Sequence, residues 1–199
     1  MAKKNTSSGQ VRIISGQWRS RKLPIHDLEG LRPTTDRVRE TLFNWLANDI
    51  RGARVLDCFA GSGALCLEAL SRYASFATII ELQKNAAHQL KQNLATLQCQ
   101  NAEVINADSL QVLAKGTPSG FDIVFIDPPF RKDLVKKTIE LLMQHQWLNP
   151  NAQIYLETES ELTSVNVPAT WVALKEKKAG QVCYRLYQYQ PNNTELSAD

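Results

Sequence analysis

The chain has 199 residues, of which 43% are hydrophobic and 22% are charged, so its length and composition suit one globular domain with a sizeable core. No apolar run approaches the ~18 residues that a membrane-spanning helix needs. The start, MAKKNTSSGQ, lacks the apolar stretch of a secretory signal. We therefore expect a cytoplasmic protein with no membrane partner. The net charge of +3 says little by itself.

The distribution of that charge is more informative. Residues 1–40 carry a net charge of +5 and the remainder carries −2, and residues 1–26 contain six basic side chains and no acid. The segment VRIISGQWRSRKL (residues 11–23) has apolar residues around a Ser-Gly turn, which predicts a β-hairpin. A basic hairpin on a mildly acidic body is typical of polyanion binding, so we predict that it binds nucleic acid. Its cationic residues are Arg12, Arg19, Arg21 and Lys22.

The next segment, RPTTDRVRETLFNWL (residues 32–46), predicts a helix capped by Thr34 or Thr35. From residue 53 onward, apolar strands alternate with helical patterns. Strands are predicted within 53–59, 76–82, 102–108, 121–130 and 151–159, and helices within 62–72, 84–97, 109–116 and 131–148. This alternation predicts a doubly wound α/β fold with a parallel sheet. Residues 170–190 predict an antiparallel strand pair that closes the sheet edge, before a polar tail.

Acidic residues stand at or just beyond the ends of the first four predicted strands. They are Asp57, Glu81, Asp108 and Asp127. Ligands of open α/β sheets bind beyond the carboxyl ends of the strands. Glu81 lies 18 residues after Gly63, a suitable reach for the two hydroxyls of a ribose, and Asp108 can accept from an exocyclic amine such as that of adenine. We therefore predict a nucleoside site, although each acid alone is also compatible with a helix cap.

The loop after the first strand indicates which nucleoside. Gly61 and Gly63 permit a tight turn and close approach to a ligand, but Cys66 replaces the third glycine of the dinucleotide fingerprint. Asp57 precedes the loop, where a carboxylate repels a pyrophosphate and suits a ligand's ammonium group. These features favour S-adenosylmethionine over NAD. An NAD-dependent oxidoreductase remains the alternative suggested by the glycine turn. The three scattered histidines and four scattered cysteines match no metal spacing, so we expect no metal site.

The fourth strand ends in Asp127-Pro128-Pro129-Phe130. The prolines terminate the strand and stiffen the turn after it, so the Asp127 carboxylate and the Pro128 carbonyl become two fixed acceptors. Phe130 offers a flat ring beside them. Two acceptors and a ring fit an amino group on a planar base, and accepting both of its N–H bonds aims its lone pair at a methyl carbon. The alternative is a plain strand-ending turn.

The order of VLDCFAGSGALCLEALSR, IIELQKN, NADSL and FDIVFIDPPF resembles class I S-adenosylmethionine-dependent amino-methyltransferases with an (N/D)PP(Y/F) motif. The flanking RIISGQWRSRKL and LRPTTDRVRETLFNWL narrow the resemblance to RsmD-type methyltransferases. It implies a Rossmann-like, mostly parallel seven-stranded sheet. It also implies methylation of a guanine N2 amine in 16S ribosomal RNA, with naked RNA, the small ribosomal subunit or an assembly intermediate as substrate.

The resemblance assigns roles to individual residues. The methionine-binding loop would comprise Asp57, Phe59, Gly61 and Gly63; Glu81 would hold the ribose; Asp108 and Ser109 would hold the adenine; and Asp127, Pro128 and Phe130 would hold the target guanine. Asp127 and Phe130 stand where adenine enzymes more often carry Asn and Tyr, which weakens the alternative of a DNA adenine-N6 methyltransferase. A non-catalytic RNA-binding module is a further alternative, which the set of strand-end acids disfavours.

The sequence leaves the roles of two arginines open. Arg37 and Arg39, at the start of the helix predicted within residues 32–46, can face either RNA phosphates or the carboxylate of the cofactor. We also expect a monomer, divided into a basic RNA-binding hairpin extension (1–30), a methyltransferase domain (31–190) and a polar tail (191–199).

Overall fold

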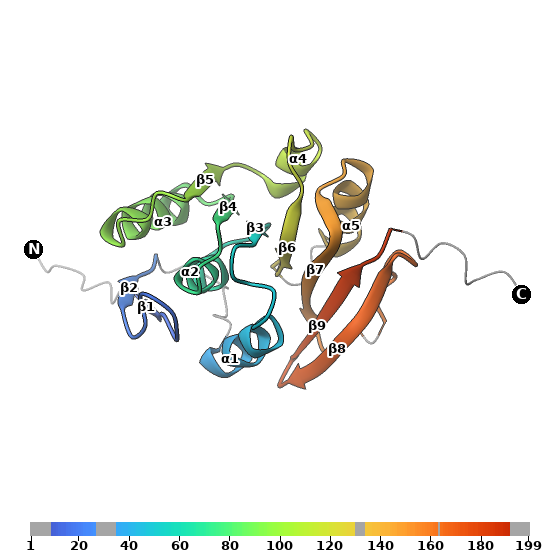
Figure 1. Cartoon of the computed structure of the whole chain (residues 1–199), viewed down its shortest axis with the longest axis horizontal. Helices are drawn as coiled ribbons and strands as arrows, with labels where there is room; N and C mark the ends of the chain where they lie inside the picture. Colours follow the sequence, from blue (N-terminus) through green and yellow to red (C-terminus); the bar gives the residue numbers. More distant parts are fainter. Residues whose placement is uncertain (1–8, 27–34, 130–133, 163, 192–199) are drawn as a thin grey trace, which may run out of the picture.

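The computed structural model describes residues 9–26, 35–129, 134–162 and 164–191. Its centre is a seven-stranded sheet of order β5-β4-β3-β6-β7-β9-β8 (Figure 1). The strands span Arg54–Asp57 (β3), Phe76–Glu81 (β4), Ala102–Asn106 (β5), Phe121–Ile126 (β6), Leu148–Glu159 (β7), Trp171–Ala179 (β8) and Val182–Tyr189 (β9). Strands β3 to β7 pair in parallel, and β9 pairs antiparallel with both β7 and β8. The predicted α/β class and the antiparallel closing pair are confirmed.

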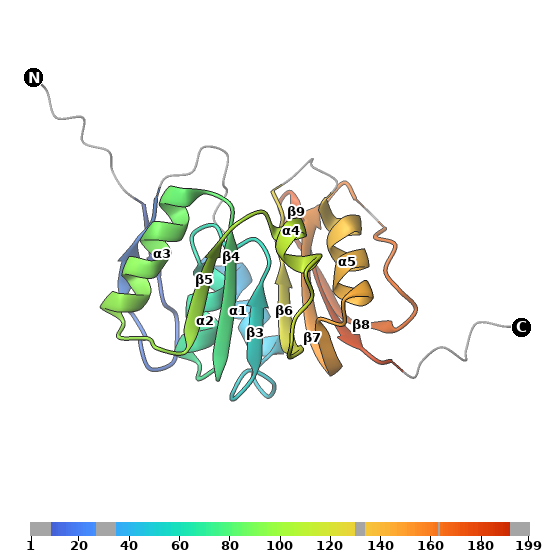
Figure 2. The ribbon, with the colours of Figure 1, turned by 90° about the horizontal axis from the view of Figure 1, so that it is seen from above.

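Helices cover both faces of this sheet (Figure 2). Helices α1 (Asp36–Trp45), α2 (Ala64–Ser71) and α3 (Lys84–Thr96) pack on one face, and α4 (Ser109–Leu113) and α5 (Leu134–Gln144) pack on the other. Along β6, Ile123 and Phe125 join the first core, whereas Val124 and Ile126 join the second. Successive side chains of a strand point to opposite faces, so a strand covered on both faces needs the continuous apolar run seen at FDIVFI.

Helix α1 begins where the sequence predicted a cap. The Thr35 hydroxyl accepts a hydrogen bond from the Val38 backbone N–H at 3.4 Å, and Asp36 occupies the first turn. Val38 and Leu42 are buried against the sheet. Trp45 is half-buried and stacks on Tyr184, with 5.4 Å between the ring centroids. This contact joins α1 to β9.

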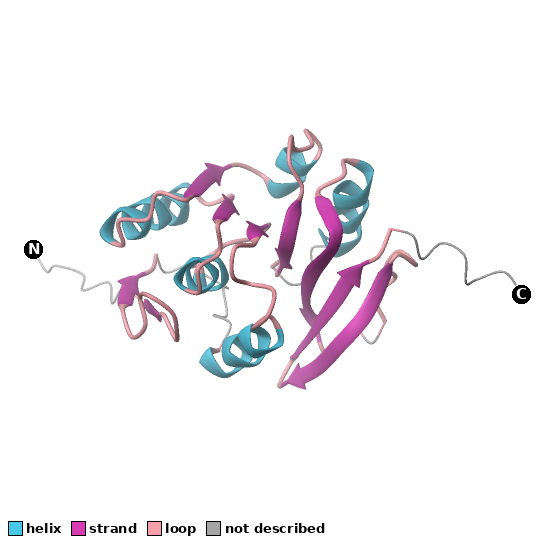
Figure 3. Cartoon of the chain, in the orientation of Figure 1, coloured by secondary structure: helices cyan, strands magenta, loops and turns pink. Residues whose placement is uncertain are grey.

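The predicted hairpin forms a separate small sheet beside α2, in which β1 (Gln10–Arg12) pairs antiparallel with β2 (Lys22–Pro24) (Figure 3). The Glu68 carboxylate, fully buried on α2, accepts from the backbone N–H groups of Ile14 at 2.7 Å and Ser15 at 3.0 Å. Gly16 (φ +82°) approaches the helix so closely that an added Cβ would lie 1.9 Å from the Ser71 carbonyl oxygen. The hairpin is therefore held in a fixed position against α2.

One predicted helix is shorter than expected. The pattern predicted a helix over 131–148, but α5 ends at Gln144, and residues 131–133 lie outside the described part. Gln146 adopts a left-handed φ of +55°, which stops the helix. The Trp147 indole N–H then donates to the Leu113 carbonyl at 2.9 Å, and Leu148 begins β7. Within the described residues, none of the helices has the length and apolarity needed to cross a bilayer.

Candidate functional site

The carboxyl ends of three neighbouring strands, β4, β3 and β6, meet at one edge of the sheet. Asp57 ends β3 and is in register with Phe125 of β6, so Asp127 follows two residues beyond that pair. Glu81 ends β4, and Asp108 stands two residues after the end of β5. The parallel register therefore brings the predicted acids to the same edge of the sheet.

The glycine loop is tied to β4 through Glu81, which is 6% exposed. The Gly61 backbone N–H donates to Glu81 Oε2 at 2.7 Å, and the Gln83 N–H donates to Oε1 at 2.6 Å. Burial raises the pKa of the Glu81 carboxyl, and these N–H groups oppose the rise. Each carboxylate oxygen retains a further lone pair, so the group can order the loop and also accept from a hydroxyl.

The structure gives a reason for glycine at position 63 that adds to the predicted one. Its φ of +77° belongs to the left-handed region, and an added Cβ would lie 2.3 Å from Cδ2 of Leu90 on α3. A larger residue at this position would therefore collide with a buried core side chain, whereas the predicted approach to a ligand stays a prediction. The turn itself is as expected, because Gly61 also has a positive φ, of +52°.

Asp57 is 2% exposed at the end of β3. Burial raises its carboxyl pKa to about 7, the nearby charge of Glu81 adds to the rise, and the backbone N–H groups of Phe59 and Cys66 oppose it. Within the described residues no cation acts to lower this pKa, and a cationic group of a ligand would do so. Phe59, the next predicted residue of the loop, is half-buried.

Asp108 and Ser109 lie at the start of α4. The Asp108 carboxylate caps this helix by accepting from the Gln111 backbone N–H at 3.0 Å, so the capping role that the sequence left open is present. Ser109 is 6% exposed, and its buried hydroxyl has no hydrogen-bond partner among the described residues. A buried hydroxyl without a partner marks a place where a polar ligand atom is favoured.

The Asp-Pro-Pro turn follows β6 directly. Asp127 is half-buried, Pro128 is buried and Pro129 is exposed, whereas Phe130 lies outside the described residues. The neighbours of this turn on β7 were not predicted from the sequence. There, the buried Tyr155 hydroxyl donates to Glu157 Oε2 at 2.7 Å.

Tyr155 and Glu157 border the turn because Leu156, between them, pairs with Ile126. Burial first, then the charges of Glu157 and Asp127, raise the pKa of Tyr155. The sequence IYLETE could have predicted this pair. Alternate residues of a strand lie on the same face, so Tyr155 and Glu157 share one face of a strand beside β6.

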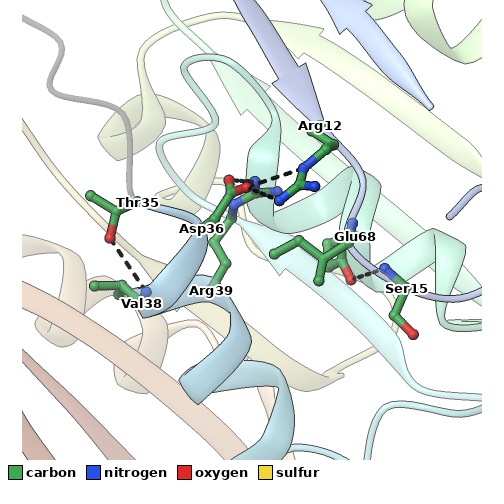
Figure 4. A network of polar contacts seen from close by, with 8 residues as sticks. Arg12, Ser15, Thr35, Asp36, Val38, Arg39 and Glu68 are labelled. Atoms are coloured by element: carbon green, nitrogen blue, oxygen red, sulfur yellow. Dashed lines mark hydrogen bonds and ion pairs between the residues drawn. The ribbon is translucent and has the colours of Figure 1, made fainter. Parts of the chain in front are cut away.

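The four predicted RNA-binding side chains are all exposed on the hairpin or its connection. Arg12 Nη2 bonds Asp36 Oδ2 at 2.7 Å, so this cation also links the hairpin to α1 (Figure 4). Arg21 Nη2 donates to the Thr96 carbonyl at 3.4 Å, which points it toward the end of α3.

The carboxyl ends of these strands thus carry buried carboxylates, a glycine turn and the Ser109 hydroxyl, which has no hydrogen-bond partner among the described residues. This donor set fits a ligand with ribose hydroxyls, an amine-bearing base and an ammonium group, as in S-adenosylmethionine. The acids disfavour a pyrophosphate. No cluster of three or more metal-ligating His, Cys, Asp or Glu side chains occurs within the residues that the structure describes.

Comparisons with known proteins show which family the chain belongs to. A family model described as "Conserved hypothetical protein 95" matches residues 11–188. "Ribosomal RNA small subunit methyltransferase D" of Escherichia coli K12 is 60% identical over 190 residues, covering 94% of this chain and 95% of that protein. The protein of the same name from Haemophilus influenzae is 54% identical, covering 92% and 95%. A solved Escherichia coli structure, described as a proposed methyltransferase, superimposes with a TM-score of 0.85 at 58% identity, covering 92% of this chain and 99% of that one.

Proposed function

The chain belongs to the RsmD family, and we propose that it transfers a methyl group from S-adenosylmethionine to small-subunit ribosomal RNA. We further propose that the acceptor is the exocyclic N2 amine of a guanine in 16S RNA. The name shared by the relatives supports small-subunit ribosomal RNA as the substrate. The assignment of the guanine N2 amine as acceptor is supported by the Asp-Pro-Pro turn and by the resemblance of residues 127–130 to the family's motif.

One observation carries the proposal. The glycine loop and the Asp-Pro-Pro turn follow neighbouring parallel strands, with Asp57 of β3 paired to Phe125 of β6. A ligand bound over the loop therefore lies beside a base held at Asp127 and Pro128. Methyl transfer needs donor and acceptor side by side in this way, because fixing the two reactants supplies much of the rate enhancement.

The mechanism assigns separate tasks to these residues. Bound S-adenosylmethionine supplies an electrophilic methyl group. Glu81 would accept from its ribose hydroxyls, Asp108 and Ser109 would bind the adenine, and Asp57 would lie beside the ammonium group. Asp127 and the Pro128 carbonyl accept both N–H bonds of the guanine amine, which directs the nitrogen lone pair toward the methyl carbon and stabilises the developing positive charge. As the N–C bond forms, the bond between the methyl carbon and the donor's sulfur would break with its electron pair staying on sulfur, and the surplus proton of the nitrogen would pass to water. Phe130 would provide the stacking surface.

The hairpin provides the RNA surface in this proposal. Its exposed cations would neutralise phosphates and position the RNA without reading its sequence. The target guanine must be unstacked to reach the turn. We also propose that the protein acts as a cytoplasmic monomer, with residues 1–30 as the RNA-binding extension and residues 31–190 as the methyltransferase domain.

Transfer of labelled methyl from S-adenosylmethionine tests the proposal. The substrates are naked 16S RNA, small subunits lacking the modification, and duplex DNA, with the labelled nucleoside identified by digestion and mass. N2-methylguanosine from RNA or subunits is expected, and its source shows which assembly state is recognised. Label in DNA adenine would support the assignment of the methyl-transfer site and refute the assignment of RNA as the substrate. Absence of label from every substrate, with cofactor binding verified, would refute the RNA assignment.

A further inference from the structure

A second acid lies beside the Asp-Pro-Pro turn and has no role in the mechanism above. Glu157 of β7 is 6% exposed, and the Tyr155 hydroxyl donates to its Oε2 at 2.7 Å. No described residue donates to Oε1, and this atom is not one of the fully buried polar atoms that lack a partner, so a ligand can reach it. Arg39 of α1 differs, because its unpaired Nε and Nη1 are closed to solvent.

The environment of Glu157 favours a ligand that donates a hydrogen bond. Tyr155 is fully buried, and its ring packs edge-on against Phe125 with 6.2 Å between the centroids. Burial first, then the charges of Glu157 and Asp127, raise the pKa of Tyr155, so its hydroxyl keeps the proton that it donates. Burial also raises the pKa of Glu157, and the Tyr155 hydrogen bond opposes the rise. A further donor would stabilise the carboxylate form in the same way.

Glu157 and Asp127 lie across from each other at the carboxyl ends of β7 and β6, which are neighbours in the sheet (Figure 1). Phe125 of β6 pairs with Tyr155 of β7, and each acid stands two residues further along the chain. The charge of Asp127 acts on Tyr155, which places both acids near this hydroxyl. Neighbouring strands are about 4.8 Å apart, so a base held by its amine at Asp127 presents the adjacent atoms of its edge to Glu157.

The atom next to the amine separates the two purines. Guanine carries N1–H, a donor, beside its N2 amine, whereas adenine carries an unprotonated N1, an acceptor, beside its N6 amine. Asp127 and the Pro128 carbonyl accept from an amine, which both bases possess, so the turn alone does not distinguish them. A carboxylate oxygen beside the turn accepts from guanine N1–H and faces the lone pair of adenine N1. A site built for a donor strongly rejects an analogue that lacks it.

We propose that Oε1 of Glu157 accepts the N1–H of the target guanine and thereby selects guanine over adenine, while Tyr155 is a positioning residue that holds Oε2. This inference rests on the proposed function and names a specificity determinant for it. The cofactor is the weaker candidate for this contact, because its proposed ligands follow β3, β4 and β5, and β6 separates β7 from those strands.

The experiment compares two target bases that both carry the N2 amine. The RNA or subunit that accepts label is rebuilt from two RNA pieces, with guanine or 2-aminopurine at the methylated position. 2-Aminopurine has an unprotonated N1 and lacks O6. The wild type should show a kcat/KM for guanine about 10-fold or more above that for 2-aminopurine.

Glu157→Gln assigns this preference to the residue. The Tyr155 hydroxyl can stay bonded to the amide oxygen, which turns the NH₂ group toward the base, where it opposes N1–H and suits the N1 acceptor of 2-aminopurine. The ratio of kcat/KM for guanine to that for 2-aminopurine should fall by about 10-fold or more. Glu161→Gln, at an exposed position, is the matched control and should leave the ratio unchanged. Tyr155→Phe keeps the ring but releases Oε2, so it should lower the ratio less than Glu157→Gln does.

Several results would overturn the inference. Equal losses on both substrates in Glu157→Gln would make the residue structural, and a wild-type ratio near one would exclude any selection at N1. If circular dichroism shows that Glu157→Gln does not fold, Tyr155→Phe must lower the ratio. Weakened binding of S-adenosylhomocysteine with an unchanged ratio would assign Glu157 to the cofactor. Absence of label from the guanine substrate would refute the proposed function itself, whereas label without preference would refute only this role of Glu157.

Discussion

At the scale of single residues, Asp57 links the cofactor loop to stability. Its folded pKa of about 7 lies above its usual value of 3.8, so the folded state binds this proton more tightly than the unfolded state does. Its contribution is therefore complete below about pH 4 and is lost as pH rises through 7. We predict that Asp57→Asn is more stable than the wild type at pH 8 by roughly 2–4 kcal/mol, and that the difference shrinks toward pH 4.

Urea unfolding at several pH values without cofactor measures this difference. Asp49→Asn, at an exposed position, is the control and should show no comparable trend. A stability gain for Asp57→Asn that is equal at pH 4 and pH 8 would contradict the titration of Asp57. The sequence revealed an acid at the strand end, but its protonation state depends on tertiary burial that no local pattern encodes.

Asp127 carries the prediction about chemistry. Asp127→Ala removes one of two proposed acceptors for the guanine amine, so we expect methyl transfer to fall by about 10²-fold or more. Binding of S-adenosylhomocysteine, measured by calorimetry, should survive within about threefold, because the proposed cofactor contacts lie on β3, β4 and α4. Turnover close to that of the wild type would refute the positioning role. Glu161→Ala, at an exposed position, serves as the control for activity.

At the scale of elements, Gly63 joins the loop to the packing of α2 and α3. Gly63→Ala combines a left-handed backbone with a Cβ 2.3 Å from Leu90 Cδ2, and Leu90 is 1% exposed. Overpacking and backbone strain together should destabilise the fold by about 2–5 kcal/mol. Gly52→Ala separates the two effects, since its φ is +80° but nothing lies within 4 Å of its Cβ. That variant should lose only about 1–2 kcal/mol.

Unfolding free energies of Gly63→Ala, Gly52→Ala, Leu90→Ala and the double variant Gly63→Ala with Leu90→Ala measure these effects. If crowding against Leu90 is responsible, the double variant should be less destabilised than the sum of the single ones, by about 1 kcal/mol or more. Additive losses, or equal losses at Gly52 and Gly63, would show that the backbone alone makes glycine necessary.

The elements differed in how well the sequence predicted them. Strand β6 was evident because a strand buried on both faces needs an uninterrupted apolar run, and the predicted cap at Thr34 or Thr35 indicated the start of α1, which the structure places after Thr35. The predicted end of α5 was wrong. The helix stops because Gln146 adopts a left-handed conformation, which usually marks a glycine in the sequence, and because the Trp147 side chain is hydrogen-bonded to the distant Leu113 carbonyl. The partner contacts of Glu68, Arg39 and Tyr155 were also missed, because they depend on tertiary packing that no local pattern encodes.

At the scale of the whole molecule, the fixed hairpin places its charge on one side of the domain. Glu68 holds the hairpin through two backbone N–H groups and is paired with Arg72 at 2.7 Å. The cations therefore keep a constant position relative to the Asp-Pro-Pro turn. An RNA bound at these cations can place one base at the carboxyl ends of the strands. A flexible basic arm would position that base less reproducibly.

This arrangement predicts a specific salt dependence of RNA binding. Replacing Arg19, Arg21 and Lys22 by alanine should weaken binding and reduce the slope of log K against log salt by about 2, at ~0.7 for each phosphate that is no longer neutralised. Replacing Lys175, Lys177 and Lys178, exposed on β8 at the opposite edge of the sheet, removes the same charge and should leave the slope nearly unchanged. Equal effects of the two triple variants would show that the hairpin contributes to RNA binding only through the net charge of the protein. A larger change in the slope for the β8 variant would show that RNA binds at β8 and not at the hairpin.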